Sequence, residues 1–308
     1  MLESVCESDI TTSLEGIYVS FIEELQSGSI LVADGATGTI LQAAGLPSGT
    51  LPEEWNVIEP AKIESMHRAY LEAGARIILT NTFGGNRLKL SRAGKDLDVE
   101  RFNRAGAEIA RRVGDEYSAF VGGDMGPTGE LMSPMGPLTA DVAREAYAEQ
   151  AAALASAGVD LLVIETMSDL SEAQAAIEGA HDATDLPIVC TMSFDTRGRT
   201  MMGVKPEQMM STLWPLGLAA IGVNCGKSLE ENLGALTSLR DANPDALLWI
   251  KANAGLPRLD GDIVVYDTAP AEFAEYALRF ADVGAKVIGG CCGSTPAHIT
   301  AIAQAVKK

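Results

Sequence analysis

The sequence predicts a single-domain (β/α)8 barrel, and three observations support this. A helix, a glycine and then an apolar strand recur along the chain. The apolar segments are nearly continuous hydrophobic runs, as expected for parallel strands buried on both faces. Eight such segments fit within 308 residues, most of them separated by enough chain for a helix. An open doubly wound sheet is the alternative, but no Gly-x-Gly-x-x-Gly follows the first segment.

The first 28 residues are predicted to form an extension ahead of the barrel, which would occupy residues 29–308. Within this extension, residues 13–27 have the helical period, with Ile17, Phe21 and Leu25 among the apolar positions. We expect this extra amphipathic helix to cover the bottom of the barrel. No linker or low-complexity segment interrupts the rest of the chain.

The predicted strands follow one another at regular intervals. A glycine ends the helix ahead of several of them, as at Gly74, Gly158 and Gly284. The eight predicted strands begin near Ile30, Arg76, Ala119, Asp160, Pro187, Ala219, Leu247 and Lys286.

Composition excludes several classes of partner. The chain has 42 acidic and 23 basic residues, a net charge of −19, so it would repel nucleic acids and anionic membranes. No stretch approaches the roughly 20 apolar residues that cross a bilayer. The first residues are acidic where a signal peptide would be basic. We therefore expect a cytoplasmic protein, and the odd total of five cysteines fits a reducing compartment better than disulfides.

Three cysteines follow two late strands and suggest a metal site. Cys225 ends the sixth predicted strand, and the vicinal pair Cys291 and Cys292 follows the eighth. The glycines around the pair allow both sulfurs to turn toward one point, and all three would then meet at the C-terminal rim. Three thiolates are one short of a closed zinc site, which leaves a position for a substrate. Inert burial is the alternative, and we prefer it for Cys6 and Cys190.

Other loops at the predicted rim are polar and rich in glycine. Each alone is typical of turn geometry, but together they surround the three cysteines. They comprise residues 34–39, 80–86, 123–129, 165–169 and 253–255. The three histidines, His67, His181 and His298, are interpreted as structural or surface residues.

Four motifs resemble the zinc-dependent homocysteine S-methyltransferase family. That family includes betaine–homocysteine methyltransferase, the S-methylmethionine-dependent enzymes and the homocysteine module of cobalamin-dependent methionine synthase. The resemblance runs from about Ile30 to the C-terminus, and the segments 126–131, 193–199 and 253–257 look closest to the methionine synthase module. The motifs are Asp34-Gly-Ala-Thr-Gly-Thr39, Thr80-Asn-Thr-Phe83, Gly222-Val-Asn-Cys225 and Gly289-Gly-Cys-Cys-Gly-Ser-Thr-Pro296.

The resemblance implies a (β/α)8 barrel with zinc held by Cys225, Cys291 and Cys292, and homocysteine as the methyl acceptor. Glu165 would take the substrate ammonium, and Asp34 with Gly35 would hold the amino-acid end. Thr82 and Asn224 occupy matching loop positions. Asn253 is a candidate temporary fourth ligand before substrate arrives.

Two positions depart from what the resemblance leads us to expect. Thr166 stands where betaine-using members carry an aromatic residue, which counts against betaine as the donor. Lys251 stands where an acid is expected before the Asn-Ala-Gly turn, and the sequence offers no reason for it.

The chemistry requires an activated thiol and an electrophilic methyl donor. A free thiol has a pKa of about 8.5, so little of it is thiolate at pH 7 unless zinc removes the proton. Likeness to the methionine synthase module suggests a methylated corrinoid carried by a separate protein, or a chain that is a fragment of a longer one. The alternatives are a small sulfonium donor such as S-methylmethionine, another thiol acceptor, or a non-catalytic zinc- or thiol-sensing subunit.

Overall fold

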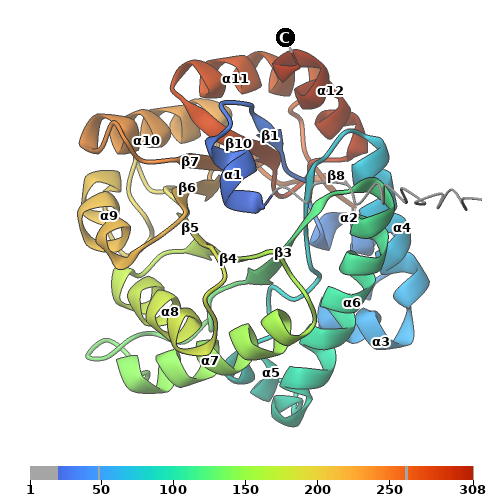
Figure 1. Ribbon diagram of the computed structural model, residues 1–308, viewed down its shortest axis with the longest axis vertical. Helices are drawn as coiled ribbons and strands as arrows, with labels where there is room; N and C mark the ends of the chain where they lie inside the picture. The colour runs from blue at the N-terminus through green and yellow to red at the C-terminus, as the bar shows by residue number, and fades with distance from the viewer. Residues whose placement is uncertain (1–19, 48, 261–262, 308) are drawn as a thin grey trace, which may run out of the picture.

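The computed structural model describes residues 20–47, 49–260 and 263–307 and contains the predicted barrel (Figure 1). All eight predicted strands are present and parallel. Their order around the sheet is β1, β10, β7, β6, β5, β4, β3 and β2. They are β1 (Leu31–Val32), β2 (Ile77–Leu79), β3 (Phe120–Met125), β4 (Leu161–Met167), β5 (Ile188–Met192), β6 (Ala220–Cys225), β7 (Leu248–Ala252) and β10 (Ala285–Gly290).

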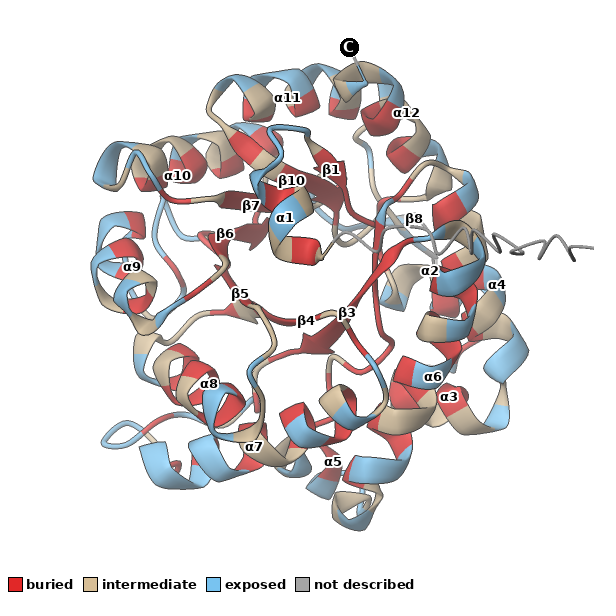
Figure 2. Cartoon of the chain, in the orientation of Figure 1, coloured by how far each residue is buried: buried red, intermediate tan, exposed pale blue. Residues whose placement is uncertain are grey.

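Helices surround the strands, and the side of each helix that faces the strands is the buried side (Figure 2). Proline at the first helical position begins α4, α9, α11 and α12, where its missing N–H has no partner to lose. The helices are α1 (Phe21–Gln26), α2 (Gly38–Ala43), α3 (Trp55–Ile58), α4 (Pro60–Glu72), α5 (Arg87–Ser91), α6 (Val99–Tyr117), α7 (Ala140–Ser156), α8 (Leu170–Ala183), α9 (Pro206–Leu213), α10 (Leu229–Ala242), α11 (Pro270–Asp282) and α12 (Pro296–Val306), with short 3-10 turns at Pro52–Glu54, Asp96–Asp98 and Trp214–Leu216. None of these helices has the length and apolar character needed to cross a membrane.

The barrel closes at a seam between β1 and β2. Strand β1 has only two residues, and its link to β2 is a single parallel bridge between Ala33 and Ile77. Two further main-chain hydrogen bonds reinforce this bridge, from Arg76 N to Val32 O and from Asp34 N to Ile77 O. The seam therefore has less main-chain pairing than the ladders around the rest of the barrel.

Alternate residues of each strand fill the inside of the barrel. Inward side chains such as Leu31, Phe120 and Trp249 form an interior cluster, and Phe21 and Leu25 of α1 join it. The rings of Phe21 and Phe120 lie 5.6 Å apart, edge to face. Because Phe120 begins β3, α1 lies at the end of the barrel where the strands start. Residues 13–19 of the predicted helix lie outside the described residues.

The sequence did not predict a small antiparallel hairpin after β7. It consists of β8 (Arg258–Asp260) and β9 (Ile263–Val265) and lies at the C-terminal end of the barrel strands. Tyr266 follows it and packs its ring against Gly293, which leaves no room for a side chain at that position. The hairpin thus leads directly to the turn that carries the vicinal cysteines.

Candidate active site and metal centre

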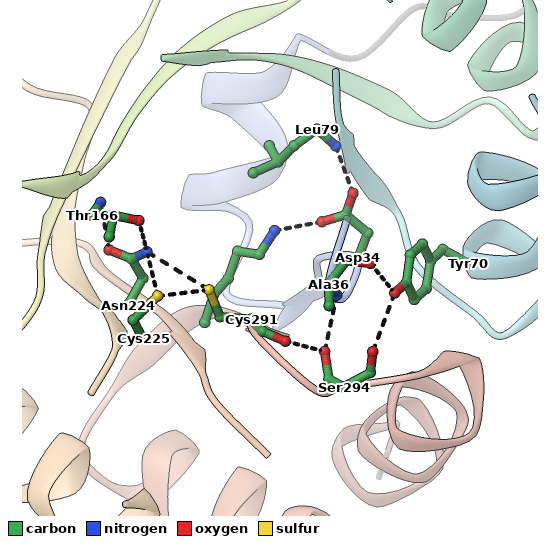
Figure 3. A network of polar contacts seen from close by, with 10 residues as sticks. Asp34, Ala36, Tyr70, Leu79, Thr166, Asn224, Cys225, Cys291 and Ser294 are labelled. Carbon is green, nitrogen blue, oxygen red and sulfur yellow. Dashed lines mark hydrogen bonds and ion pairs between the residues drawn. The ribbon is translucent and has the colours of Figure 1, made fainter. Parts of the chain in front are cut away.

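The structure brings the sulfurs of Cys225, Cys291 and Cys292 together. Their Sγ atoms all lie within 4.8 Å of one another. Those of Cys225 and Cys291 are 2.9 Å apart, and Figure 3 shows these two pointing toward each other. Cys225 has a left-handed backbone with φ of 57°, followed by Gly226 with φ of 80°. This strained end of β6 turns the Cys225 side chain toward the turn after β10.

The three sulfurs suit a zinc ion in number and chemistry. Zinc–sulfur bonds of about 2.3 Å in a tetrahedron place sulfurs about 3.8 Å apart. The Cys225–Cys291 pair would therefore open by about 0.9 Å from its 2.9 Å separation to receive the ion. Within the described part of the chain, no His, Asp, Glu or further Cys joins this cluster. A tetrahedral ion held here would keep one position open.

The metal-free thiols share their protons unevenly. Hydrogen bonds from Cys225 and Cys291 lower the pKa of Cys292 to about 3. Hydrogen bonding to the other two thiols and burial raise the pKa of Cys225. Of the three thiols, Cys292 is therefore the one that loses its proton most readily, and the thiolate is the form that binds metal.

A cavity of about 530 Å³ lies beside the sulfurs at the C-terminal rim. The ends of β3, β4, β6 and β7 contribute Asp124, Glu165, Cys225 and Lys251 to its lining, and the turn after β10 contributes Cys291 and Cys292. The turn after β1 contributes residues 35–39. More distant loops contribute mainly apolar groups, including Leu51, Pro52, Phe83, Val264 and Tyr266.

The floor of the cavity is the polar uppermost layer of the barrel interior. Along β7, Trp249 points inward and Ile250 outward, so Lys251 points inward again. The same alternation turns Asp124 of β3 and Glu165 of β4 inward. One oxygen of each carboxylate, Asp124 Oδ1 and Glu165 Oε2, is buried without a hydrogen-bond partner. Such atoms are expected to find a partner in a ligand or water.

Burial changes the protonation of these two acids. It raises the pKa of Glu165 to about 8, against the opposing effect of Lys251. Burial and the neighbouring Glu165 raise the pKa of Asp124 above its ordinary value. The floor therefore retains protons near neutral pH when no ligand cation is present.

Each carboxylate oxygen of Asp34 accepts a hydrogen bond from the protein. Lys251 Nζ donates to Asp34 Oδ1 at 2.5 Å, and Leu79 N donates to Oδ2 at 2.8 Å. The side chains of Lys251 and Asp34 are only 4% and 1% exposed. This pair accounts for the lysine that the sequence left unexplained. Asp34 does not line the cavity, whereas Gly35 and the four residues after it in this turn do.

Asn224 and Thr82 support the site from behind the cavity lining. The Asn224 amide accepts from Thr166 N and from Thr191 Oγ1, and its NH2 donates to Thr166 Oγ1 and lies 3.7 Å from Cys225 Sγ. Thr82 Oγ1 donates to Asp124 O at 2.8 Å and so supports the floor. Both side chains are completely buried.

Asn253 is turned toward the loop after β6. Its NH2 donates to Gly226 O at 2.8 Å, while its Oδ1 is buried without a partner. Two of the three histidines have structural contacts, whereas neither ring nitrogen of His67 has a hydrogen-bond partner. His67 is buried, His298 bonds to Thr268 O, and His181 contacts Leu216 O.

Sequence reasoning missed several residues of the cavity. Asp124 lay in a rim segment but was not singled out, and its signal was the inward position at the end of β3. Phe83 also lay in a rim segment without being singled out. Tyr266 comes from a loop and Glu53 from a 3-10 turn, where no period reveals which side chains face a cavity. Glu53 is buried, and its Oε1 accepts from Gly84 N at 2.6 Å.

Comparison with known sequences gives a family match along almost the whole chain. The family model "Homocysteine S-methyltransferase" matches residues 31–306. Methionine synthase of Mycobacterium tuberculosis is 34% identical over 96% of this chain, and that of Mycobacterium leprae is 32% identical over 97%. The chain spans about a quarter (26%) of the length of these relatives.

Solved structures with the same fold include the homocysteine methyltransferase MmuM from Escherichia coli. Its oxidized form has a TM-score of 0.75 with 25% identity and covers 89% of this chain and 94% of its own. Its metallated form has a TM-score of 0.76 with 24% identity, covering 91% of this chain and 99% of its own.

Proposed function

Because this chain belongs to the homocysteine S-methyltransferase family, we propose that it methylates homocysteine to methionine with zinc held by Cys225, Cys291 and Cys292. The observation that carries this proposal is the convergence of the three sulfurs beside a cavity whose floor holds unpartnered carboxylate oxygens. Zinc bound there would lower the pKa of the substrate thiol and hold its sulfur as thiolate.

The residues around the sulfurs would maintain that site. Asn224 presents its NH2 to Cys225 and Cys291, at 3.7 and 4.0 Å from their sulfurs. Hydrogen bonds of this kind orient metal ligands and tune their basicity. Asn253 remains a candidate for temporary ligation, because its Oδ1 is unpartnered.

The floor of the cavity would bind the amino-acid end of homocysteine. We propose that Glu165, joined by Asp124, accepts the ammonium, because each has a buried oxygen without a partner. Gly35 would lie against the carboxylate end, with Asp34 holding that turn from below. Thr82 and Asn224 would act through the groups they position, the main chain of Asp124 and the cysteine sulfurs.

We propose a methylated corrinoid protein as the methyl donor, since the curated relatives are methionine synthases. A second candidate is a small sulfonium such as S-methylmethionine. The cavity of about 530 Å³ favours it, because that volume suits a drug-sized ligand and homocysteine alone is much smaller. Among the described residues, no His, Asp, Glu or further Cys completes the cluster, which argues against a zinc- or thiol-sensing subunit closed by another such ligand.

Parallel assays of methionine formation from homocysteine would separate these donors. Zinc-loaded protein would be supplied with methylcobalamin, a methylated corrinoid protein or S-methylmethionine. Turnover with either corrinoid but not the sulfonium supports the first proposal, and the reverse supports the second. Absence of methionine with all three, despite bound zinc, would contradict homocysteine methylation by these donors.

A further inference from the structure

A buried ion pair lies beneath the turn that carries the vicinal cysteines. Lys251 Nζ contacts Asp34 Oδ1 at 2.5 Å, and the two residues are 217 positions apart in sequence. Strand register places Lys251 beside Asn224 of β6 and beside Gly289 of β10. The lysine therefore stands between the two strands that lead to the sulfurs.

Asp34 connects this lysine to the sulfur-bearing turn through its main chain. Gly290 N, one residue before Cys291, donates to Asp34 O at 2.9 Å. Gly289 leaves room for this contact, since a Cβ there would lie 2.8 Å from Asp34 O. The position of Asp34 thus bears directly on the main chain that leads to Cys291.

Ser294 makes a second connection between the two turns. Its Oγ accepts from Ala36 N at 3.0 Å and donates to Cys291 O at 2.7 Å (Figure 3). Tyr70 adds a third contact, donating its hydroxyl to Ala36 O at 2.6 Å. The turn after β1 and the turn after β10 are therefore interlocked, and the Lys251–Asp34 pair fixes the first of them.

Asp34 also reinforces the weakest seam of the barrel. Its Oδ2 accepts from Leu79 N, so a side chain takes the place of a main-chain carbonyl where β1 has ended. Without the lysine, the carboxylate would be a buried charge with a single main-chain partner. It would then be expected to take up a proton or to move toward water, and either change would loosen the turn.

From these contacts we infer that Lys251 is a positioning residue for the sulfur cluster. Through Asp34 it holds the main chain of Gly290 so that Cys291 and Cys292 face Cys225. This inference rests on the proposed function only in identifying zinc as the ion that the cluster holds. Residues that orient metal ligands typically change metal affinity by about 10- to 100-fold when they are replaced.

The test compares zinc affinity in variants of the full chain, measured by competition with a chromophoric chelator. Lys251→Met and Asp34→Asn should each weaken zinc binding by about 10- to 100-fold. The double variant should bind no more weakly than the poorer single variant, because both changes remove the same contact.

Arg111→Met is the matched control for lost stability. Arg111 Nη1 donates to Asp160 Oδ2 at 2.7 Å, and Val121 N donates to the same oxygen at 2.7 Å. This site also joins a cation and a strand N–H to one carboxylate, here through a single oxygen, but it lies at the opposite end of the strands, ahead of β4. Arg111→Met should lower Tm and leave zinc affinity within about twofold, since no metal ligand depends on it.

A metal-free measurement keeps the inference separate from the proposed function. Diamide accepts the two hydrogens released when two thiols join, and the Cys225 and Cys291 sulfurs are 2.9 Å apart. The product is a disulfide between Cys225 and Cys291, which peptide mapping identifies. This disulfide should form more slowly in Lys251→Met and Asp34→Asn than in wild type or Arg111→Met. Zinc affinity and crosslinking unchanged in both variants would overturn the inference. Failure of the wild type to transfer a methyl group would contradict the proposed function alone.

Discussion

Removing the Lys251 ammonium should destabilise the whole barrel. Lys251→Met keeps most of the aliphatic side chain and leaves Asp34, which is 1% exposed, as a buried charge held only by Leu79 N. Breaking a buried pair in this way costs about 3–5 kcal/mol. A chain of 308 residues unfolds with an entropy of about 0.6 kcal/mol per kelvin. The expected fall in Tm is therefore about 5–8 °C.

Calorimetry of the metal-free protein at pH 7 measures this loss without a contribution from zinc. Arg104→Met is the control, since its pair with Glu108 is exposed and worth at most about 1 kcal/mol. Adding Asp34→Asn to Lys251→Met should recover part of the stability, because the amide removes the unpaired charge. A loss below about 1 kcal/mol in Lys251→Met would refute the claim that this pair closes the seam.

Three further predictions follow from the site. Each of Cys225→Ala, Cys291→Ala and Cys292→Ala should abolish zinc binding and methyl transfer while circular dichroism shows a folded barrel; global unfolding of all three would mean that the metal is structural. Glu165→Gln should raise KM for homocysteine by about tenfold or more, as expected when a charged hydrogen bond is lost, and should spare 4-mercaptobutanoate, which has no ammonium; equal loss for both thiols would exclude the ammonium role. Because burial raises the pKa of Glu165 from 4.5 to about 8, folded protein binds a proton there that unfolded protein has released. Stability should consequently fall as pH rises from about 4.5 to 8, and an unchanged slope in Glu165→Gln would contradict this assignment.

The sequence was sufficient to predict the barrel because its strands are apolar on both faces. Each predicted start lies beside an observed strand, from Leu31 in β1 to Ala285 in β10. Parallel strands all end on one side of a barrel. The predicted strands therefore also placed Cys225 and the vicinal cysteines at one rim. The convergence of the three sulfurs therefore followed from topology and from the glycines next to them.

The remaining parts of the site depend on pairings that no local pattern contains. The sequence suggested that Asp34 helps to hold the substrate, which stays a prediction, but it did not suggest that Lys251 and Leu79 donate to its two oxygens. That pairing spans 217 positions and appears only when β7 and β1 lie near one another. Asp124 was overlooked because its inward direction depends on the register of β3. Tyr266 follows a hairpin that the helix–strand period does not predict.

The proposed activity depends on a substrate sulfur reaching an ion held by three cysteines. Zinc K-edge X-ray absorption, with and without homocysteine, measures this directly. We predict three sulfur neighbours near 2.3 Å in the zinc-loaded protein, and four after homocysteine is added. An unchanged sulfur count at saturating homocysteine would contradict thiol activation at this site.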